Sequence, residues 1–122
     1  MSALILLGGG GHCRSVIDVI EQTGLYSILG VLEKKGVTRP NVVGYPLLGI
    51  DHDLPMFIKR NCAVVVTVGQ IKTSEPREQV YLYAKEMGAK LPVVVSPRAY
   101  LSCHAKVGDG STFMHGAIVN CN

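Results

Sequence analysis

The residues of this chain best suited to chemistry are four consecutive glycines and a histidine: Gly8, Gly9, Gly10, Gly11 and His12. They follow a short apolar run, residues 3–7, and precede an apolar pattern typical of a helix. Glycine permits a tight turn, and a helix N-terminus offers free N–H groups to an anion. The sequence therefore predicts a loop that binds a nucleotide or another phosphorylated metabolite. We expect His12 to contact that ligand, with helix capping as the alternative.

Other candidate binding residues follow two further apolar runs: Glu33 and Lys34 come after residues 28–32, and Gly69 and Gln70 come after residues 63–68. An acidic residue about 20 positions beyond a glycine-rich loop can bind ribose hydroxyls. We therefore expect Glu33 to contact a ribose, with a solvated turn carboxylate as the alternative. Arg14 is suited both to neutralising phosphate and to a surface ion pair, and the sequence favours neither role.

The remaining histidines are candidates for a general base or a metal ligand. His104 and His115 lie in the C-terminal part of the chain, where we expect them to be solvated or packed. His52 stands between Asp51 and Asp53, but acidic residues at the start of an expected helix favour its cap and dipole over a metal ion. The sequence therefore predicts no metal site.

Composition and charge narrow the class of protein. Apolar residues make up 48% of 122 residues, which is enough for a core and argues against disorder. The formal charge of +3 is spread without a dense run, and the chain has no Trp and two Phe, so we expect no nucleic-acid partner. The apolar start is too short for a signal or a membrane span. Reduced thiols of a cytoplasmic protein, without a zinc site, are expected at four widely spaced positions: Cys13, Cys62, Cys103 and Cys121.

The elements that must position these residues alternate between strands and helices. Strands are expected at residues 3–7, 28–32, near 42–43, at 63–68 and at 91–95, and helices at 15–23, 51–60 and from 73 or 74 to 87. Such an alternation is typical of a parallel sheet flanked by helices, so we expect a small Rossmann-like α/β domain over residues 1–95. Ligands bind beyond the carboxyl ends of such strands, so the turns at 8–12, 33–35 and 69–72 are expected to share one crevice.

After Pro97 a six-residue repeat replaces this alternation. Small residues recur at Ala99, Ala105, Ser111 and Ala117, and larger apolar residues recur two places later at Leu101, Val107, Phe113 and Val119. A repeat of this kind is typical of a parallel β-helix, whose interior the larger side chains fill. We expect residues 96–122 to begin such a helix. The alternative is an ordinary pair of strands with a hairpin turn at residues 108–110.

The repeat is short for a structure that stands alone. With about three hexapeptides per turn, residues 99–122 make little more than one coil, and roughly three or more repeats are usually needed for stability. The chain also ends within a repeat. We therefore expect it to be the N-terminal part of a longer protein.

These features, in this order, resemble the bacterial sugar acyltransferases, a family that includes sialic acid O-acetyltransferases and UDP-4-amino-sugar N-acetyltransferases. Gly8–His12 matches the glycine-rich loop of the family. Residues 96–102 resemble the beginning of its hexapeptide region, and residues 44–49 resemble the stretch before its next helix. The resemblance covers the whole chain and implies a small α/β domain followed by a left-handed β-helix.

The resemblance also implies a function. The N-terminal domain would hold a nucleotide-sugar acceptor, with Gly8–His12 facing its phosphates or sugar, Glu33 and Lys34 at the nucleoside, and residues 69–70 at the crevice. The β-helix would bind acetyl-CoA between the subunits of a homotrimer. The general base of the family is a histidine in a later coil, which would lie beyond Asn122. The resemblance thus implies part of an acetyltransferase of bacterial glycan biosynthesis, inactive alone, with no catalytic residue and no bound cofactor in this part.

Two other functions stay open. An NAD(P)-dependent oxidoreductase would use the Gly-x-Gly-x-x-Gly fingerprint, but Cys13 occupies the position of its third glycine. A nucleotide-binding or assembly module without catalytic activity is the second alternative.

Overall fold

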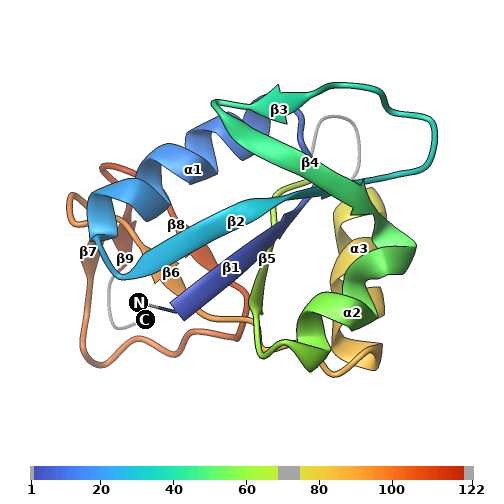
Figure 1. The fold of residues 1–122 in the computed structure, drawn as a ribbon. Coiled ribbons are helices and arrows are strands. Elements are labelled where there is room, and N and C mark those ends of the chain that lie inside the picture. The colour runs from blue at the N-terminus through green and yellow to red at the C-terminus, as the bar shows by residue number, and fades with distance from the viewer. Residues whose placement is uncertain (1, 69–74, 120–122) are drawn as a thin grey trace.

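The computed structural model describes residues 2–68 and 75–119 of the chain (Figure 1). In chain order the elements are β1 (Ser2–Leu7), α1 (Gly11–Thr23), β2 (Tyr26–Glu33), β3 (Asn41–Val42), β4 (Tyr45–Ile50), the 3-10 helix η1 (Asp51–Asp53), α2 (Leu54–Lys59), β5 (Ala63–Val66), α3 (Glu75–Glu86), β6 (Val94–Val95), β7 (Tyr100–Leu101), β8 (Thr112–Phe113) and β9 (Ile118–Val119).

Five strands form the main sheet, in the order β3-β4-β2-β1-β5. β1 pairs in parallel with β2 and β5, β2 pairs in parallel with β4, and only β3 is antiparallel to its neighbour. Helices cover both faces, so the apolar run Leu4–Leu7 is fully buried, as expected for a central parallel strand. The prediction of a mixed α/β fold with a parallel-dominated sheet is confirmed.

The two faces of the sheet have separate cores. Helix α1 covers one face, and α2 with α3 covers the other (Figure 1). The face of α1 that carries Val16, Ile17 and Ile20 packs against Leu4 and Leu6 of β1. The helix ends at Thr23, and its C-cap Gly24 has a left-handed conformation (φ 66°), with its N–H bonded to the Glu21 carbonyl. The glycine loop thus connects β1 and α1, two elements whose packed faces are buried in the core.

The expected helix over residues 51–60 is divided. Residues 51–53 form the 3-10 turn η1, and α2 begins at Leu54, with Pro55 in its first turn. Asp51 is not the cap that we expected: the Asp53 carboxylate accepts the Ile50 N–H at 2.9 Å instead. Pro55 lacks an N–H and is favoured in a first turn, which explains why the α-helix starts there. The Asp51 carboxylate is left for another role.

The expected last strand of the sheet, residues 91–95, is also wrong. Within the described residues, backbone pairing of this segment with β5 is limited to the bridge between Ala63 and Lys90, and β6 pairs with β8 instead. Pro92 has no N–H to donate to a ladder, so continued pairing with β5 is disfavoured after Lys90. The departure from the sheet therefore comes earlier than the sequence suggested.

The repeat region forms two short parallel ladders. Val94 and Val95 pair with Thr112 and Phe113, and residues 100–101 pair with residues 118–119. In each ladder the partners lie three hexapeptides apart. A hairpin at residues 108–110 would pair its flanking strands in antiparallel fashion, so that alternative is wrong. The β-helix itself stays a prediction.

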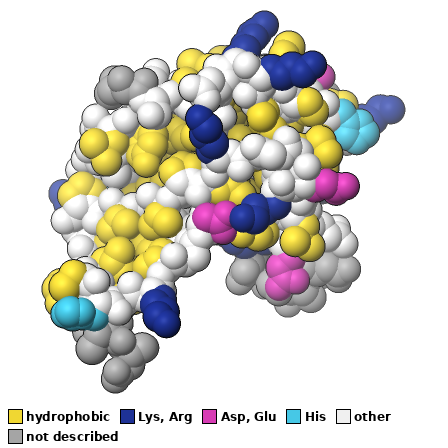
Figure 2. Space-filling model, turned by 90° about the horizontal axis from the view of Figure 1, so that it is seen from below, with side chains coloured by type: hydrophobic (Ala, Val, Ile, Leu, Met, Phe, Trp, Pro, Cys, Tyr) yellow, Lys and Arg dark blue, Asp and Glu magenta, His cyan; other side chains and the backbone are white. Residues whose placement is uncertain are grey.

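The surface seen from below mixes side chains of all kinds. Lys and Arg side chains are scattered among hydrophobic and acidic ones on this face (Figure 2). Within the described residues, this face therefore offers no continuous row of cations to a nucleic-acid backbone. No helix among residues 2–68 and 75–119 is long and apolar enough to cross a membrane.

Candidate functional site

The glycine loop begins at a residue that only glycine suits. Gly8 has a φ of 108°, and a Cβ at this position would lie 2.7 Å from Val68 Cγ2. The Gly8 N–H donates to the Leu32 carbonyl at 2.9 Å, which ties the loop to the end of β2. Thr67, which is buried, donates from its hydroxyl to the carbonyls of Leu7 (2.9 Å) and Gly8. The loop is therefore fixed by its neighbours before any ligand binds.

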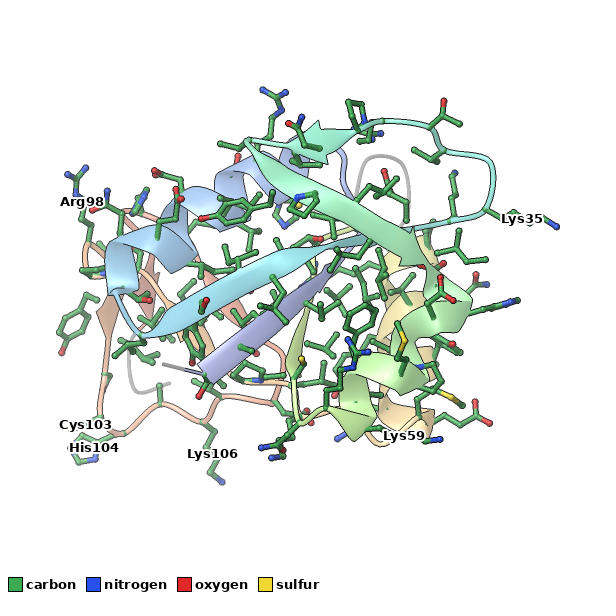
Figure 3. All side chains as sticks on the ribbon, viewed as in Figure 1. Lys35, Lys59, Arg98, Cys103, His104 and Lys106 are labelled. Atoms are coloured by element: carbon green, nitrogen blue, oxygen red, sulfur yellow. The ribbon has the colours of Figure 1, made fainter. Side chains whose placement is uncertain are left out.

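A cleft of about 560 Å³ lies at the carboxyl ends of β1, β2, β4 and β5. It is lined by Gly8, Gly9, Gly10, Gly11, His12, Glu33, Lys34, Val37, Arg39, Asp51, Thr67, Val68, Pro76 and Val80. The prediction that the loop at 8–12 and the turn after β2 share one crevice is confirmed. Gly69 and Gln70, with the rest of the third turn, lie outside the described residues. Lys35 projects away from the sheet at the outer end of its loop (Figure 3).

Glu33 is held against the glycine loop. A Cβ at Gly9 would lie 2.8 Å from Glu33 Oε2, so the missing side chain makes room for the carboxylate. Arg39 Nε lies 2.9 Å from the same oxygen, and Arg39 Nη1 donates to the Gly9 carbonyl at 2.6 Å. Glu33 is only 7% exposed, and its Oε2 is buried without a hydrogen bond from the described residues. The alternative of a solvated turn carboxylate is therefore wrong.

The N-terminus of α1 opens into this cleft. Gly10 is the N-cap, and no side chain of the described chain caps the helix. Apart from their chain neighbours and the adjacent backbone of the helix, no atom of residues 2–68 and 75–119 lies within 4 Å of the place that a Cβ at Gly10 or Gly11 would occupy. The first N–H groups of a helix have no partner within it, so this end can accept an anion.

Two ionisable groups of the cleft are shifted from their ordinary behaviour. Burial, and then the charge of Arg77, lower the pKa of His12, so its imidazole is neutral at physiological pH. Burial, and then the charge of Glu33, raise the pKa of Asp51, while His52 opposes this shift. A neutral His12 can still donate or accept a hydrogen bond. The Asp51 carboxylate is held in a place that disfavours its charge.

Three residues of the cleft were missed in the sequence: Arg39, Asp51 and Thr67. Arg39 lies in a turn-rich stretch, and its role depends on its contact with Glu33 and on a contact with Gly9 that spans 30 positions. Asp51 was visible as a polar residue after the apolar stretch at residues 45–48, but it was interpreted as a helix cap. In the structure β4 ends at Ile50 and β5 at Val66, so Asp51 and Thr67 each directly follow a strand of the sheet, a position that the expected bounds did not show.

The other candidate residues lie away from the cleft. His115 is hydrogen-bonded through Nδ1 to Ser96 Oγ, and its Nε2 donates to Asp18 at 2.8 Å. Arg14 lines a separate hollow with Asp18 and His115. His104 projects outward at the opposite end of the molecule from the loop of Lys35 (Figure 3). Neither histidine can reach a ligand in the cleft.

The structure offers little to a metal ion. The described part of the chain has no group of three or more His, Cys, Asp or Glu side chains that could hold one. Cys13 and Cys62 are buried free thiols, Cys103 is an exposed one, and Cys121 lies outside the described residues. Burial, the largest influence, raises the pKa of Cys13, which is therefore a packed thiol rather than a reactive one.

Comparisons with known proteins agree on one family. The sequence model of the PglD N-terminal domain matches residues 3–82. PerB from Caulobacter crescentus, solved with CoA and GDP-perosamine, is 26% identical over 98% of this chain and 55% of that chain, with a TM-score of 0.85. The acetyltransferase domain of PglB from Neisseria gonorrhoeae FA1090, solved with acetyl coenzyme A, is 29% identical over 95% of this chain and 54% of that chain, with a TM-score of 0.80. No curated protein sequence matches significantly. The chain spans just over half the length of these solved relatives.

Proposed function

Because the chain belongs to the PglD N-terminal domain family, we propose that it is the acceptor-binding part of an acetyl-CoA-dependent nucleotide-sugar acetyltransferase of bacterial glycan biosynthesis. The solved relatives support this proposal, since both are acetyltransferases and one holds GDP-perosamine beside CoA. The observation that carries it for this chain is the cleft, which is lined by an uncapped helix N-terminus and by the buried carboxylate of Glu33, held there by Arg39. The family favours this function over an oxidoreductase or an assembly module.

The cleft suits a nucleotide-sugar from its phosphates to its ribose. The diphosphate binds at the Gly8–His12 loop, to N–H groups at the start of α1, where the backbone at Gly10 and Gly11 is open and the helix dipole is favourable. Glu33, held by Arg39, accepts hydrogen bonds from ribose hydroxyls, and Lys34 lies in the cleft near the nucleoside. We assign Gly69 and Gln70 to the same crevice on the sequence pattern alone.

Arg39 adds a cation to the diphosphate position. Its guanidinium donates a hydrogen bond to the Gly9 carbonyl, and its side chain is 42% exposed. It can therefore turn toward a phosphate and keep its ion pair with Glu33. Neutral His12 donates a hydrogen bond to the acceptor rather than a charge. Together these groups orient the acceptor, which is the contribution of a binding domain to a transfer between two bound substrates.

The chemical step needs groups from the rest of the parent protein. Acetyl transfer requires a base that takes the proton of the acceptor amine or hydroxyl as it attacks the thioester. We propose that this base is a histidine of a later coil, because His104 and His115 lie away from the cleft. Residues 96–122 then begin a left-handed β-helix, after an acceptor domain of residues 1–95. That helix binds acetyl-CoA in a homotrimer, and the present chain alone is inactive.

Titration calorimetry with UDP-sugars, GDP-sugars and CMP-sialic acid tests the acceptor site. We expect at least one to bind, and Glu33→Gln to weaken its affinity about 10-fold or more. Glu86→Gln makes the same change on the exposed end of α3 and should leave the affinity unchanged. If the folded chain binds none of these compounds, the proposal is wrong. Acetyl transfer by the purified chain would contradict its assigned inactivity.

A further inference from the structure

Three polar features follow one another along the carboxyl edge of the sheet. β1 leads to the N-terminus of α1, its neighbour β2 ends at Glu33, and the next strand, β4, leads to Asp51. Glu33 is paired with Ile50, the residue before Asp51, so the two carboxylates come from adjacent strand ends. All three features line the same cleft.

A bound nucleoside diphosphate would follow the same order. If the diphosphate binds at the start of α1 and the ribose binds at Glu33, the nucleobase continues in the same direction and lies over the end of β4. Val37, from the loop that follows β2, lines the cleft here with Asp51. An apolar side chain suits the face of a base, and a polar one suits its edge.

The Asp51 carboxylate has capacity to bind such an edge. Its backbone carbonyl accepts the Tyr83 hydroxyl at 3.0 Å, which fixes the main chain. No hydrogen bond to its side chain is found among residues 2–68 and 75–119, while burial and the nearby Glu33 raise its pKa. The neighbouring Glu33 Oε2 is buried and ion-paired with Arg39, but it makes no hydrogen bond within the described residues, so it too has capacity to accept a donor.

Nucleobases differ in the donors that they offer to a carboxylate. Guanine presents a ring N–H and an adjacent amino group, which together match two carboxylate oxygens. Uracil has one N–H between two carbonyls, and adenine and cytosine place one amino group beside an acceptor nitrogen, so each would set an acceptor against the carboxylate. We therefore propose that Asp51 accepts hydrogen bonds from a guanine ring, and that the acceptor of this chain is a guanosine diphosphate sugar. This inference rests on the proposed function above.

The test measures the affinities of GDP, UDP, CDP and ADP for the protein by titration calorimetry. We expect GDP to bind roughly 10-fold more tightly than the others, the discrimination typical of a paired contact to a base. In Asp51→Asn, whose amide offers one acceptor and one donor, GDP should weaken about 10-fold while UDP holds its affinity. Asp109→Asn, the same change on a residue outside the cleft, should keep the wild-type preference.

The outcomes separate this inference from the function on which it rests. Equal affinities of GDP and UDP for the wild-type protein would overturn it and leave the acceptor site in place. An equal loss of all four compounds in Asp51→Asn, with its melting curve intact, would overturn it as well. If none of the four compounds binds, and no nucleotide-sugar binds either, both proposals are wrong.

Discussion

The cleft differs from the junction between the α/β part and residues 94–119 in how fully the polar side chains are hydrogen-bonded by the protein itself. In the cleft, Glu33 is buried with an oxygen that makes no hydrogen bond to the described residues. Burial and the negative charge of Glu33 raise the pKa of Asp51. The Asp51 carboxylate is thus held where its charge is disfavoured, and Glu33 depends on Arg39 as its one charged partner among the described residues.

At the junction the polar side chains satisfy one another. His115 of the repeat region is hydrogen-bonded to Ser96 and to Asp18 of α1. On the other side, Asp109 accepts hydrogen bonds from Lys85 (2.5 Å) and Tyr81 (2.6 Å) of α3. These contacts join the repeat region to helices on both faces of the sheet.

The difference teaches which groups belong to the fold and which to a ligand. A polar group that its own chain satisfies stabilises the folded state, whereas a partly buried carboxylate without donors, such as Asp51, destabilises it until a ligand supplies them. Substitutions in the two regions should therefore have opposite effects on stability and on binding.

Gly9→Ala should have the largest effect, because it disturbs both stability and binding. Its Cβ would lie 2.8 Å from Glu33 Oε2 and 3.1 Å from Val42 Cγ2, so we expect the free energy of unfolding in urea to fall by about 1–3 kcal/mol. Displacement of Glu33 should abolish nucleotide-sugar binding. Gly11→Ala is the matched control: it has open space, and helix propensity should raise its stability by up to about 1 kcal/mol. Equal stability of the two variants would contradict the close packing at Gly9.

Ser96→Ala should destabilise the protein without affecting the cleft. Ser96 is 1% exposed, and its hydroxyl also accepts the Arg98 N–H at 3.0 Å, so its loss should cost about 1 kcal/mol in urea unfolding. A double-mutant cycle with His115→Ala should give a coupling energy of at least about 0.5 kcal/mol. Nucleotide-sugar affinity should be unchanged. A lower affinity would mean that the junction and the cleft are not independent.

Asp51→Asn should stabilise the free protein at neutral pH. Because the folded state raises the pKa of Asp51, its charge costs stability as pH rises through that pKa, and the cost is absent below about pH 4, where the unfolded side chain is also protonated. Solvent screens this partly exposed side chain, so we expect a gain of only up to about 0.5 kcal/mol. Melting temperatures across pH measure it, and they should converge in acid. A loss of stability at neutral pH would mean that the carboxylate serves the fold.

The same contrast explains what the sequence could predict. The glycine loop, Glu33 and the six-residue repeat are visible because each depends on local order or on a short period. Arg39 was not visible, because its role comes from contacts with Gly9 and Glu33 that only the folded chain brings together. Asp51 was visible but misinterpreted, since an acidic residue before a helix suits both a cap and a strand end. The strand expected at residues 91–95 failed because Pro92 outweighs its apolar neighbours.

Asp109→Asn should have the smallest effect and the opposite pH dependence from Asp51→Asn. The hydrogen bonds from Lys85 and then Tyr81 lower the pKa of Asp109, so its contribution is present above about pH 4 and is lost as pH falls through its lower folded pKa. The cluster is open to solvent, which screens it, so the drop in melting temperature at neutral pH should be slight and should shrink in high salt. In acid the variant and the wild type should melt together. If Asp109→Asn instead raised the melting temperature at neutral pH, as Asp51→Asn should, the polar contacts of the junction would not stabilise the fold. The contrast with the cleft would then be wrong.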